Sequence, residues 1–333
     1  MLLLGGEMME KRKVLVRAEG IKKTFPVNRG FLSGKQKSVH ALDDVTLEIF
    51  AGETLGLVGE SGCGKSTLGR TLLRLIEPTE GKVEFSGKDI TSLSPKELRA
   101  LRQKMQIIFQ DPYASLNPRM TIYEALEAPL LNYHCPAVER DNRVREIAKK
   151  VGLNEAWLHR YPHEFSGGQR QRIVIARALI LKPEFVVCDE AVSALDVSVR
   201  SQVLNLMSDL QKDLSLTYLF ISHDLSVIKH ISDRIMVMYL GRIVEIASKH
   251  DLLEKPLHPY TQALISAIPK PIVGAKRESD LLKGDVPSPI DPPSGCPFHP
   301  RCKACMPCCK KEVPKMRNVG NDHFVACHLI QYS

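Results

Sequence analysis

The sequence predicts an α/β fold, and three observations support this prediction. Short apolar runs that are typical of buried strands alternate with segments of helical spacing along most of the chain. One of these runs, at residues 54–58, leads into a glycine-rich loop that is followed by a helical pattern at residues 68–76. The length of 333 residues and the charged fraction of 25% suit a soluble protein with one large domain and an appendage.

The glycine-rich loop, Gly59-Glu-Ser-Gly-Cys-Gly-Lys-Ser-Thr67, fits the P-loop pattern G-x-x-x-x-G-K-S/T. Such a loop turns backbone N–H groups toward phosphates, and the helix that follows adds its positive dipole end. We expect Lys65 to reach the β- and γ-phosphates of ATP and Ser66 to hold Mg²⁺. A structural glycine-rich turn is the alternative for the loop taken alone. The expected nucleotide-binding residues of the loop are Gly59, Ser61, Gly62, Cys63, Gly64, Lys65, Ser66 and Thr67.

The chain before the loop alternates like β-strands at residues 14–18, 39–42 and 45–49. A basic insertion that contains a glycine, residues 28–37, is expected to be a flexible loop. Phe25 lies at the exit of the first strand, where an aromatic ring is able to stack on adenine. A core residue at the edge of the sheet is the alternative interpretation of Phe25.

Beyond the loop, the pattern predicts a strand pair at residues 81–87, a polar helix from about Ser94 and a central strand at residues 106–110. Gln110 ends this strand, within reach of a ligand that crosses the sheet edge. Residues 121–160 are rich in Glu, Arg, Ala and Leu and are expected to be helical.

A second phosphate-binding helix start is expected at Ser166-Gly-Gly, which opens a helix that runs to residue 181. The P-loop already supplies one such helix end. A second one suggests that phosphates are bound between two surfaces. A plain N-cap is the alternative interpretation of this segment.

An apolar strand at residues 185–190 ends in two carboxylates, Asp189 and Glu190. Successive strand residues point to opposite faces, so the two acids are able to have different tasks. We expect Asp189 to hold Mg²⁺ and Glu190 to polarise water. The next strand, residues 217–222, leads into His223, which is expected to hydrogen-bond a γ-phosphate or else to be structural.

The pattern changes near residue 250. Residues 235–246 predict a hairpin that closes the sheet, and residues 258–269 predict a short amphipathic helix. Six prolines between Asp285 and Arg301 exclude a regular helix or central strand there. We therefore expect one domain at residues 13–250 and a second at residues 251–333, with no internal repeat.

Charge and hydropathy exclude several classes of protein. The net charge of +8 comes from Lys and Arg spread along the chain, so nucleic acid is not an expected partner, and the surface suits polyphosphate ligands and an anionic membrane face. No apolar run reaches the roughly 18 residues of a membrane span, and Met1-Leu-Leu-Leu4 is too short for a signal peptide. We expect a cytosolic chain that reaches a membrane through partners or charge. The role of residues 1–12 stays open.

These motifs occur in one order and at a spacing that fits a single domain. They are the P-loop, Gln110, Phe165-Ser-Gly-Gly-Gln169, Val187-Cys-Asp-Glu190, Ser193-Ala-Leu-Asp196 and His223. Together they resemble the ATP-binding subunit of ABC transporters over about residues 13–250. The tail resembles the C-terminal extension of F-type subunits of dipeptide and oligopeptide importers, through His258-Pro-Tyr-Thr-Gln-Ala-Leu and Gly295-Cys-Pro-Phe-His-Pro-Arg-Cys302.

The resemblance implies an ABC ATPase domain with a mixed-sheet core, an antiparallel β subdomain and a helical subdomain. It also implies a head-to-tail dimer, with a second copy or a sister subunit, in which the P-loop of one chain and residues 166–169 of the other enclose each ATP. Asp196 would contact the partner, Gln110 would bind Mg²⁺ and couple the site to the transmembrane permeases, and Phe25 would stack on adenine. The implied partner-facing residues are Ser166, Gly167, Gly168 and Gln169, and the implied catalytic residues are Glu190, His223, Lys65 and Gln110.

Six of the nine cysteines lie between Cys296 and Cys327, and in a cytosolic ATP-binding chain such a cluster is more typical of a metal site than of disulfides. The spacing alone favours a 4Fe–4S cluster on Cys302-x-x-Cys305-x-x-Cys308 and one distant thiol. The resemblance favours Cys296, Cys302, Cys309 and Cys327, and we follow it. Tetrahedral Zn²⁺ on four thiolates is the alternative.

The prediction that results is an ATPase subunit, peripheral on the cytoplasmic face of the membrane, that powers import of di- or oligopeptides. An extracytoplasmic binding protein would deliver the cargo to the permeases. The first alternative is the same motor with a nickel chelate or another small solute as cargo, because related motors share these motifs. The second is a soluble ABC ATPase of DNA repair or translation, which the single cassette and the lack of a long heptad run disfavour. The third is a redox or metal sensor carried on a motor.

Overall fold

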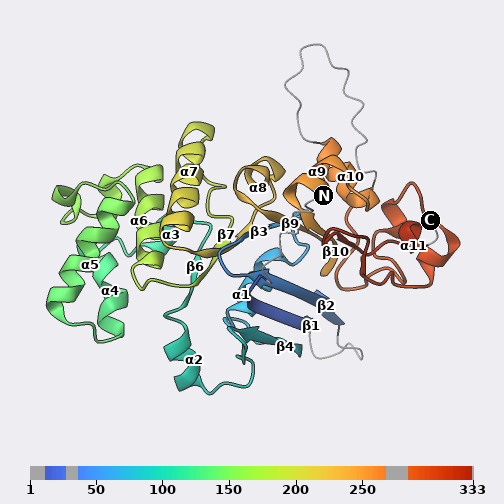
Figure 1. Cartoon of the computed structure of the whole chain (residues 1–333), viewed down its shortest axis with the longest axis horizontal. Coiled ribbons are helices and arrows are strands. Elements are labelled where there is room, and N and C mark those ends of the chain that lie inside the picture. The colour runs from blue at the N-terminus through green and yellow to red at the C-terminus, as the bar shows by residue number, and fades with distance from the viewer. Residues whose placement is uncertain (1–11, 28–36, 268–283, 332–333) are drawn as a thin grey trace, which may run out of the picture.

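The structure is a computed structural model that describes residues 12–27, 37–267 and 284–331. Two β-sheets form the centre of the molecule (Figure 1). A group of helices lies at one end of the larger sheet, and the C-terminal extension lies at the other. This is the predicted α/β fold with its antiparallel, helical and C-terminal parts. Residues 1–11 and most of the insertion expected at residues 28–37 lie outside the described ranges.

The larger sheet has the strand order β11-β12-β10-β9-β3-β8-β7-β6. The strands from β9 to β6 run parallel, whereas β10, β12 and β11 are antiparallel to their neighbours. Every residue of β3, β7, β8 and β9 is buried, as expected for apolar runs covered on both faces. The strands are β3 (Thr54–Val58), β6 (Met105–Ile108), β7 (Phe185–Asp189), β8 (Thr217–Ile221), β9 (Arg234–Tyr239), β10 (Arg242–Ser248), β11 (Arg317–Asn318) and β12 (Phe324–Val325).

The smaller sheet is antiparallel, with the order β2-β1-β4-β5. Its strands are β1 (Val14–Val27), β2 (Lys37–Phe50), β4 (Glu80–Phe85) and β5 (Lys88–Asp89). The two short strands predicted at residues 39–42 and 45–49 are one strand, because pairing continues past Asp44 in spite of its φ of 59°. Apolar side chains of this sheet share one core with α1.

Helices α3, α4, α5 and α6 pack on one another as the helical subdomain (Figure 1). The expected helices at residues 121–160 and 170–181 are present as α4, α5 and α6, whereas α7 and α8 were not predicted. Among the described residues, no helix has both the length and the apolarity needed to cross a membrane. The α-helices are α1 (Lys65–Leu72), α2 (Pro95–Leu101), α3 (Pro112–Ser115), α4 (Ile122–Asn132), α5 (Ala137–Lys150), α6 (Gly167–Leu179), α7 (Val197–Asp213), α8 (Leu225–Ile231), α9 (Lys249–Glu254), α10 (Pro259–Ser266) and α11 (His328–Gln331).

Gly69 allows α1 to lie close against the larger sheet. A Cβ atom at this position would come within 2.8 Å of Val187 on β7 and 2.9 Å of Ile221 on β8. Any larger side chain would therefore push the helix away from both strands. Because the P-loop leads directly from β3 into α1, this packing holds the loop at the carboxyl ends of the parallel strands.

The C-terminal extension continues the larger sheet. Its strand β12 pairs with β10, with Val325 opposite Glu245. The prediction that the β9–β10 hairpin closes the sheet is therefore wrong, because β12 and β11 lie beyond it. Glu245 is fully buried and accepts hydrogen bonds from the backbone N–H groups of Leu257 and His258, at 2.8 and 3.0 Å. Nε2 of His323 lies 2.7 Å from the same carboxylate. A buried carboxylate needs such partners, and these three bind the extension to β10.

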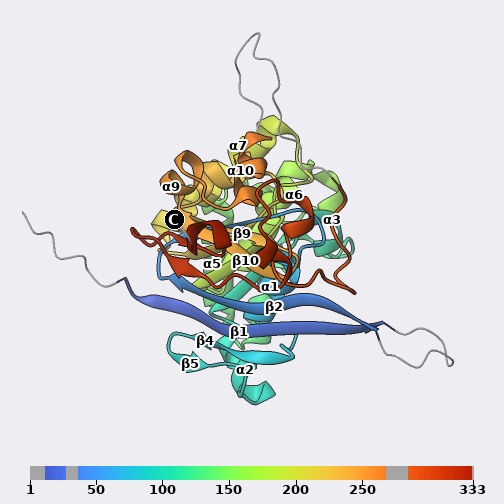
Figure 2. The same cartoon turned by 90° about the vertical axis from the view of Figure 1, so that its right-hand side faces the viewer.

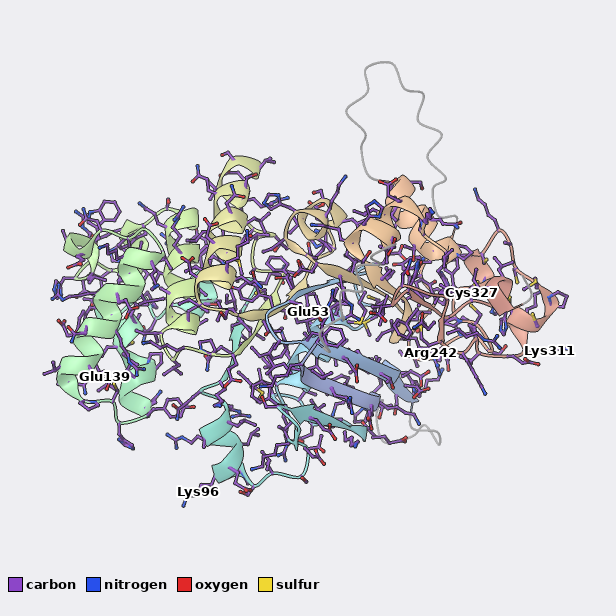
Figure 3. The ribbon with its side chains drawn as sticks, in the orientation of Figure 1. Glu53, Lys96, Glu139, Arg242, Lys311 and Cys327 are labelled. Carbon is purple, nitrogen blue, oxygen red and sulfur yellow. The ribbon has the colours of Figure 1, made fainter. Side chains whose placement is uncertain are left out.

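Aromatic rings form a second contact between the extension and the sheet. Tyr239 of β9 packs against Tyr260 and Phe298 of the extension, with ring centroids 4.7 and 5.3 Å apart. His258 packs on Phe298 at 5.7 Å. Figure 2 shows the extension beside β9 and β10, and Figure 3 shows Cys327 and Glu139 at opposite ends of the molecule.

The proline-rich stretch has the predicted irregular structure. Its described residues, 284–301, contain no α-helix and no strand, and only a short 3₁₀ turn at His299–Arg301. No strand ladder holds this stretch; its contacts include a backbone hydrogen bond from the His40 N–H of β2 to the carbonyl of Pro289, at 2.9 Å.

We predict that His258 makes the stability of the fold depend on pH. Its Nδ1 accepts a hydrogen bond from the backbone N–H of Tyr260, and burial lowers the pKa of the His258 imidazole to about 3. A histidine in the unfolded chain has a pKa of about 6.5, so the unfolded chain binds this proton first as the pH falls. The stabilisation is complete above about pH 6.5 and is lost as the pH falls toward 3.

His258→Asn tests this prediction, because Asn keeps an acceptor for the Tyr260 N–H and has no titrating ring. We expect the free energy of unfolding, measured by denaturant titration below about pH 6.5, to fall less steeply in the variant, by about 1.4 kcal/mol per pH unit. The exposed His134 supplies the matched control, His134→Asn. An unchanged pH slope in His258→Asn would contradict the prediction.

Candidate active site

The P-loop has the backbone geometry that its glycines permit. Gly62 and Gly64 have φ angles of 79° and 104°, in the left-handed region that favours glycine. A Cβ atom on Gly64 would lie 2.2 Å from the carbonyl oxygen of Ala41, so no other residue fits there. The loop runs into α1 at Lys65, the first residue of that helix, and its backbone amides thus meet the positive end of α1.

Lys65 is buried inside its own loop, with 5% of its surface exposed. Its Nζ donates to the carbonyl oxygens of Gly59 and Glu60, at 2.7 and 2.9 Å. Cys63 is also buried, and burial raises the pKa of its thiol. The Cys63 side chain therefore packs in the core, whereas the ammonium group of Lys65 stays within the loop.

Ser66 and Asp189 meet at the start of α1. The Ser66 hydroxyl donates to Oδ1 of Asp189 at 2.6 Å, and Arg70, one turn further along α1, donates to Oδ2 at 3.3 Å. Asp189 is only 3% exposed. Arg70 was not among the predicted site residues, although its position four residues after Ser66 places both on one face of α1.

Glu190 joins the other predicted residues at this edge of the sheet. Its Oε2 accepts a hydrogen bond from Nε2 of Gln110 at 3.2 Å and lies 3.2 Å from Nδ1 of His223. Glu190 has a φ of 51° and lies just beyond β7, while Gln110 and His223 lie just beyond β6 and β8. Because these three strands are neighbours in the sheet, their ends bring the three side chains together.

Residues 166–169 lie in the helical subdomain, away from the P-loop of the same chain. Ser166 caps α6, since its Oγ accepts from the Gln169 N–H while its own N–H donates to Gln169 Oε1. Figure 1 shows α6 well separated from α1. A Cβ atom on Gly168 would come 2.4 Å from Val199 of α7, which explains a glycine at this helix contact.

Asp196 and Phe25 lie outside this group of side chains. Asp196 caps α7, and the hydrogen bond from the Val199 N–H is the main reason why the pKa of this carboxyl is lowered. Phe25 is 37% exposed near the end of β1, with the Lys23 ammonium 5.0 Å from the centre of its ring. The ring is thus partly exposed at the edge of the antiparallel sheet, and its stacking on adenine stays a prediction.

The tail cysteines lie near one another and are free thiols. Cys296, Cys309 and Cys327 are buried, and the Cys296 N–H donates to the carbonyl of Cys309 at 2.8 Å. Burial, with smaller effects from the neighbouring Cys309, Cys327 and Cys302, raises the pKa of Cys296 to about 12. Within the described ranges, however, no group of three or more His, Cys, Asp or Glu side chains has an arrangement that would hold a metal. The predicted iron–sulfur or zinc site is therefore not supported by this geometry.

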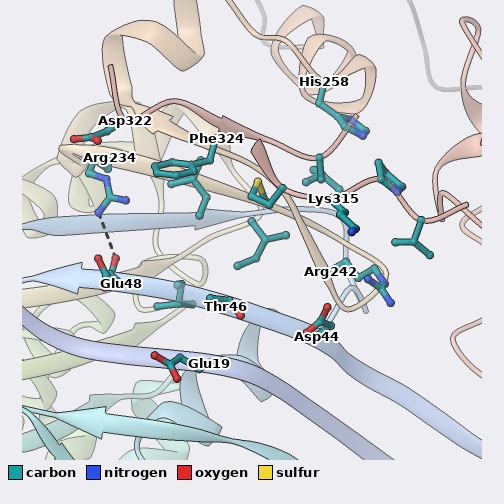
Figure 4. Close-up of a pocket in the computed structure, with 18 of the residues that line it drawn as sticks. Glu19, Asp44, Thr46, Glu48, Arg234, Arg242, His258, Lys315, Asp322 and Phe324 are labelled. Atoms are coloured by element: carbon teal, nitrogen blue, oxygen red, sulfur yellow. Dashed lines mark hydrogen bonds between the residues drawn. The ribbon is translucent and has the colours of Figure 1, made fainter. Parts of the chain in front are cut away.

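A cavity of about 1080 Å³ separates the C-terminal extension from the antiparallel sheet (Figure 4). Glu48 and Thr46 of β2, Arg242 of β10, and Lys315 and Phe324 of the extension are among its lining residues. No residue of the P-loop lines it. This cavity is therefore distinct from the nucleotide site that the sequence predicts.

Two family models match the chain. One is described as ABC transporter and matches residues 42–193, and the other is described as the C-terminal region of oligopeptide/dipeptide transporters and matches residues 244–309. The oligopeptide transport ATP-binding protein AppF of Bacillus subtilis is 52% identical over 322 residues, which are 96% of this chain and 98% of AppF. The putative oligopeptide transport ATP-binding protein YkfD of the same organism is 56% identical over 303 residues, 90% and 92% of the two chains.

Solved structures are similar as well. The structure of cbiO1 from Clostridium perfringens, part of the ABC transporter complex cbiONQ, has a TM-score of 0.64 at 27% identity and covers 73% of this chain and 92% of its own. The ATP-binding cassette MJ0796, a dimer in a post-hydrolysis state with ADP and phosphate bound, has a TM-score of 0.61 at 29% identity and covers 71% and 99%. With its site geometry, its two family matches and relatives above half identity over nearly the full length, this chain belongs to the ATP-binding proteins of the oligopeptide/dipeptide ABC transporter family.

Proposed function

We propose that this chain is the ATP-hydrolysing subunit that powers import of di- or oligopeptides through a membrane complex. The observation that carries this proposal is the convergence of Gln110 and His223 on Glu190, next to the pair formed by Ser66 and Asp189. The names of the relatives, which specify oligopeptide transport, favour peptides over a nickel chelate as the cargo.

The side chains present suit ATP with Mg²⁺. Ser66 and Asp189 offer a hydroxyl and a carboxylate 2.6 Å apart, and Mg²⁺ prefers oxygen donors of this kind. We assign Ser66, Asp189 and Gln110 as the residues that would hold the ion, which when bound neutralises charge on the β- and γ-phosphates. Lys65 would donate to the same phosphates, supported by the backbone N–H groups of the P-loop.

Glu190 is the proposed general base for the attacking water. Gln110 and His223 both meet its Oε2, so they hold the carboxylate in one orientation at the carboxyl edge of the sheet. Fixing a base in this way reduces the entropy that must be lost in the transition state. His223 is 56% exposed at its side chain and is therefore accessible to a γ-phosphate.

A second ATP-binding subunit would complete the site. Ser166 and the first backbone amides of α6 would form a phosphate-binding helix end. This end lies away from the P-loop of the same chain, so we assign it to the nucleotide of a partner. We infer that Asp196 contacts the same partner and that Phe25 stacks on adenine. The chain would sit at the cytoplasmic face of the membrane against permease subunits that receive peptide from an extracytoplasmic binding protein.

We also propose that the tail thiols bind a 4Fe–4S cluster, with Zn²⁺ as the alternative. The support is the donor chemistry, because Cys302, Cys309 and Cys327 lie near enough to Cys296 to contribute to the raised pKa of its thiol. When bound, either metal would cross-link a proline-rich segment that has little regular structure of its own. The site lies outside the cassette and would be structural or regulatory.

Glu190→Gln is expected to keep ATP binding and to lower ATP turnover by at least about 100-fold, because the base is lost while shape is conserved. An ATP-bound dimer should accumulate. Phosphate release and size-exclusion chromatography of the full chain measure both effects. Glu184→Gln, the same change at the opposite end of β7, is the matched control. Near-normal turnover in Glu190→Gln would remove Glu190 as the base.

Ser166→Arg is expected to abolish turnover while each monomer still binds one nucleotide, because Ser166 would serve the ATP of the partner. Nucleotide binding by calorimetry and phosphate release measure the two effects separately. Ser94→Arg is the matched control, since Ser94 forms an equivalent capping box on α2. If the affinity of the monomer fell together with turnover, the assignment of Ser166 to a partner site would be wrong.

The full chain purified without oxygen is expected to be brown and to contain iron and acid-labile sulfide. Cys309→Ser should lose the cluster, whereas Cys305→Ser and the distant Cys135→Ser should retain it. Metal analysis and absorption spectra measure these outcomes. Stoichiometric zinc without sulfide would contradict the cluster. Retention in Cys309→Ser with loss in Cys305→Ser would overturn the choice of ligands.

A further inference from the structure

We propose that the C-terminal extension is part of the nucleotide site, because Arg301 and Tyr260 hold the P-loop at Glu60. Glu60 is the second residue of the loop, and both partners lie beyond residue 250. Arg301 and Tyr260 would act as positioning residues that set the conformation of the loop and thereby the affinity for nucleotide. This proposal rests on the assignment of residues 59–67 as the ATP-binding loop.

The side chain of Glu60 is held by a bidentate ion pair. Arg301 donates through Nη1 to Oε2 at 2.6 Å and through Nη2 to Oε1 at 3.0 Å. Two parallel hydrogen bonds fix the direction of the carboxylate as well as its position. The Arg301 side chain is only 5% exposed, and the hydrogen bonds to Glu60 are the main reason why its pKa is raised. Solvent therefore screens this pair far less than it screens an ion pair on the surface.

The backbone of Glu60 is held on both sides. Its N–H donates to the hydroxyl of Tyr260 at 2.9 Å, and its carbonyl accepts from Nζ of Lys65 at 2.9 Å. Burial raises the pKa of Tyr260, so this hydroxyl stays protonated. The residue is thus fixed at its side chain, its amide and its carbonyl. The last of these contacts reaches the lysine that would meet the phosphates, and the chain of contacts runs from the extension to Lys65.

The two positioning residues are themselves held by rigid surroundings. Arg301 ends a short 3₁₀ turn that begins at His299, and its N–H donates to the carbonyl of Phe298 at 3.0 Å. Its guanidinium group lies 5.9 Å from the ring centre of Tyr239 on β9. The ring of Tyr260 packs on the same tyrosine at 4.7 Å. A displacement of the extension would therefore be transmitted to Glu60 and not absorbed by flexible side chains.

A stabilising ion pair with no effect on the nucleotide site is the competing explanation. It predicts that loss of Arg301 lowers the melting temperature and leaves the affinity of the folded chain unchanged. The two explanations differ in nucleotide affinity, measured where each variant is fully folded. A second ion pair between extension and cassette supplies the control, because Lys37 and Asp291 meet at 2.9 Å on an exposed surface.

The experiment is calorimetric titration of ADP into the full-length chain at a temperature well below every melting transition. We expect Arg301→Gln and Glu60→Gln each to raise the Kd about tenfold, since each removes a charge-assisted contact to the loop. The double variant should bind no more weakly than the weaker single variant, because both changes remove one interaction. Asp291→Asn should keep the wild-type Kd.

Tyr260→Phe provides a variant that keeps the packed ring and removes only the hydroxyl. We expect it to raise the Kd about threefold, in line with the loss of one neutral hydrogen bond. This variant also keeps the test decisive if Arg301→Gln does not fold. Wild-type Kd values in the folded Arg301→Gln and Tyr260→Phe variants would overturn the proposal. So would a Kd of the Arg301→Gln, Glu60→Gln double variant that is raised by the product of the two single increases. A wild-type chain that binds no nucleotide would instead contradict the proposed function.

Discussion

The site depends on one constraint, the adjacency of β6, β7 and β8 in a parallel sheet. Parallel neighbours end at the same edge, so residues far apart in the chain meet beyond that edge. Gln110, Glu190 and His223 follow these three strands, and the first and last of them both meet Oε2 of Glu190. Asp189, the last residue of β7, meets Ser66 of α1 at the same edge. A shift of any one strand would separate a base from the groups that orient it.

The P-loop is held from two directions. On the inside, Gly69 lets α1 pack within contact of β7 and β8, which sets the position of Lys65 and Ser66. On the outside, the extension meets the loop through Arg301 and Tyr260. The extension is continuous with the larger sheet through β12 and the buried Glu245. It therefore resembles an added edge of the cassette more than a tethered domain.

Much of this organisation was predictable from the sequence because its signals are local. Glycine at the left-handed positions of the P-loop, apolar runs for strands buried on both faces, and prolines that exclude regular structure each act within a few residues. The same holds for the Ser166 cap of α6 and for the acidic pair at the end of β7. The joining of residues 39–42 and 45–49 into one strand was missed, because pairing with β1 carries β2 past Asp44. Helix α7 was missed although Asp196 is a typical N-cap.

The sequence by itself determined the type of each element and the chemical groups of the nucleotide site, because periodicity, turn residues and P-loop glycines are properties of short segments. Only the tertiary structure decided which of these groups meet. The contact of Glu60 with Arg301 joins positions 241 residues apart, and no local pattern marks either residue as a partner of the other. The pairing of β12 with β10 likewise depends on an edge that exists only after the sheet has formed. Long-range contacts of this kind are set by strand order and by the burial of charge, which no short segment encodes.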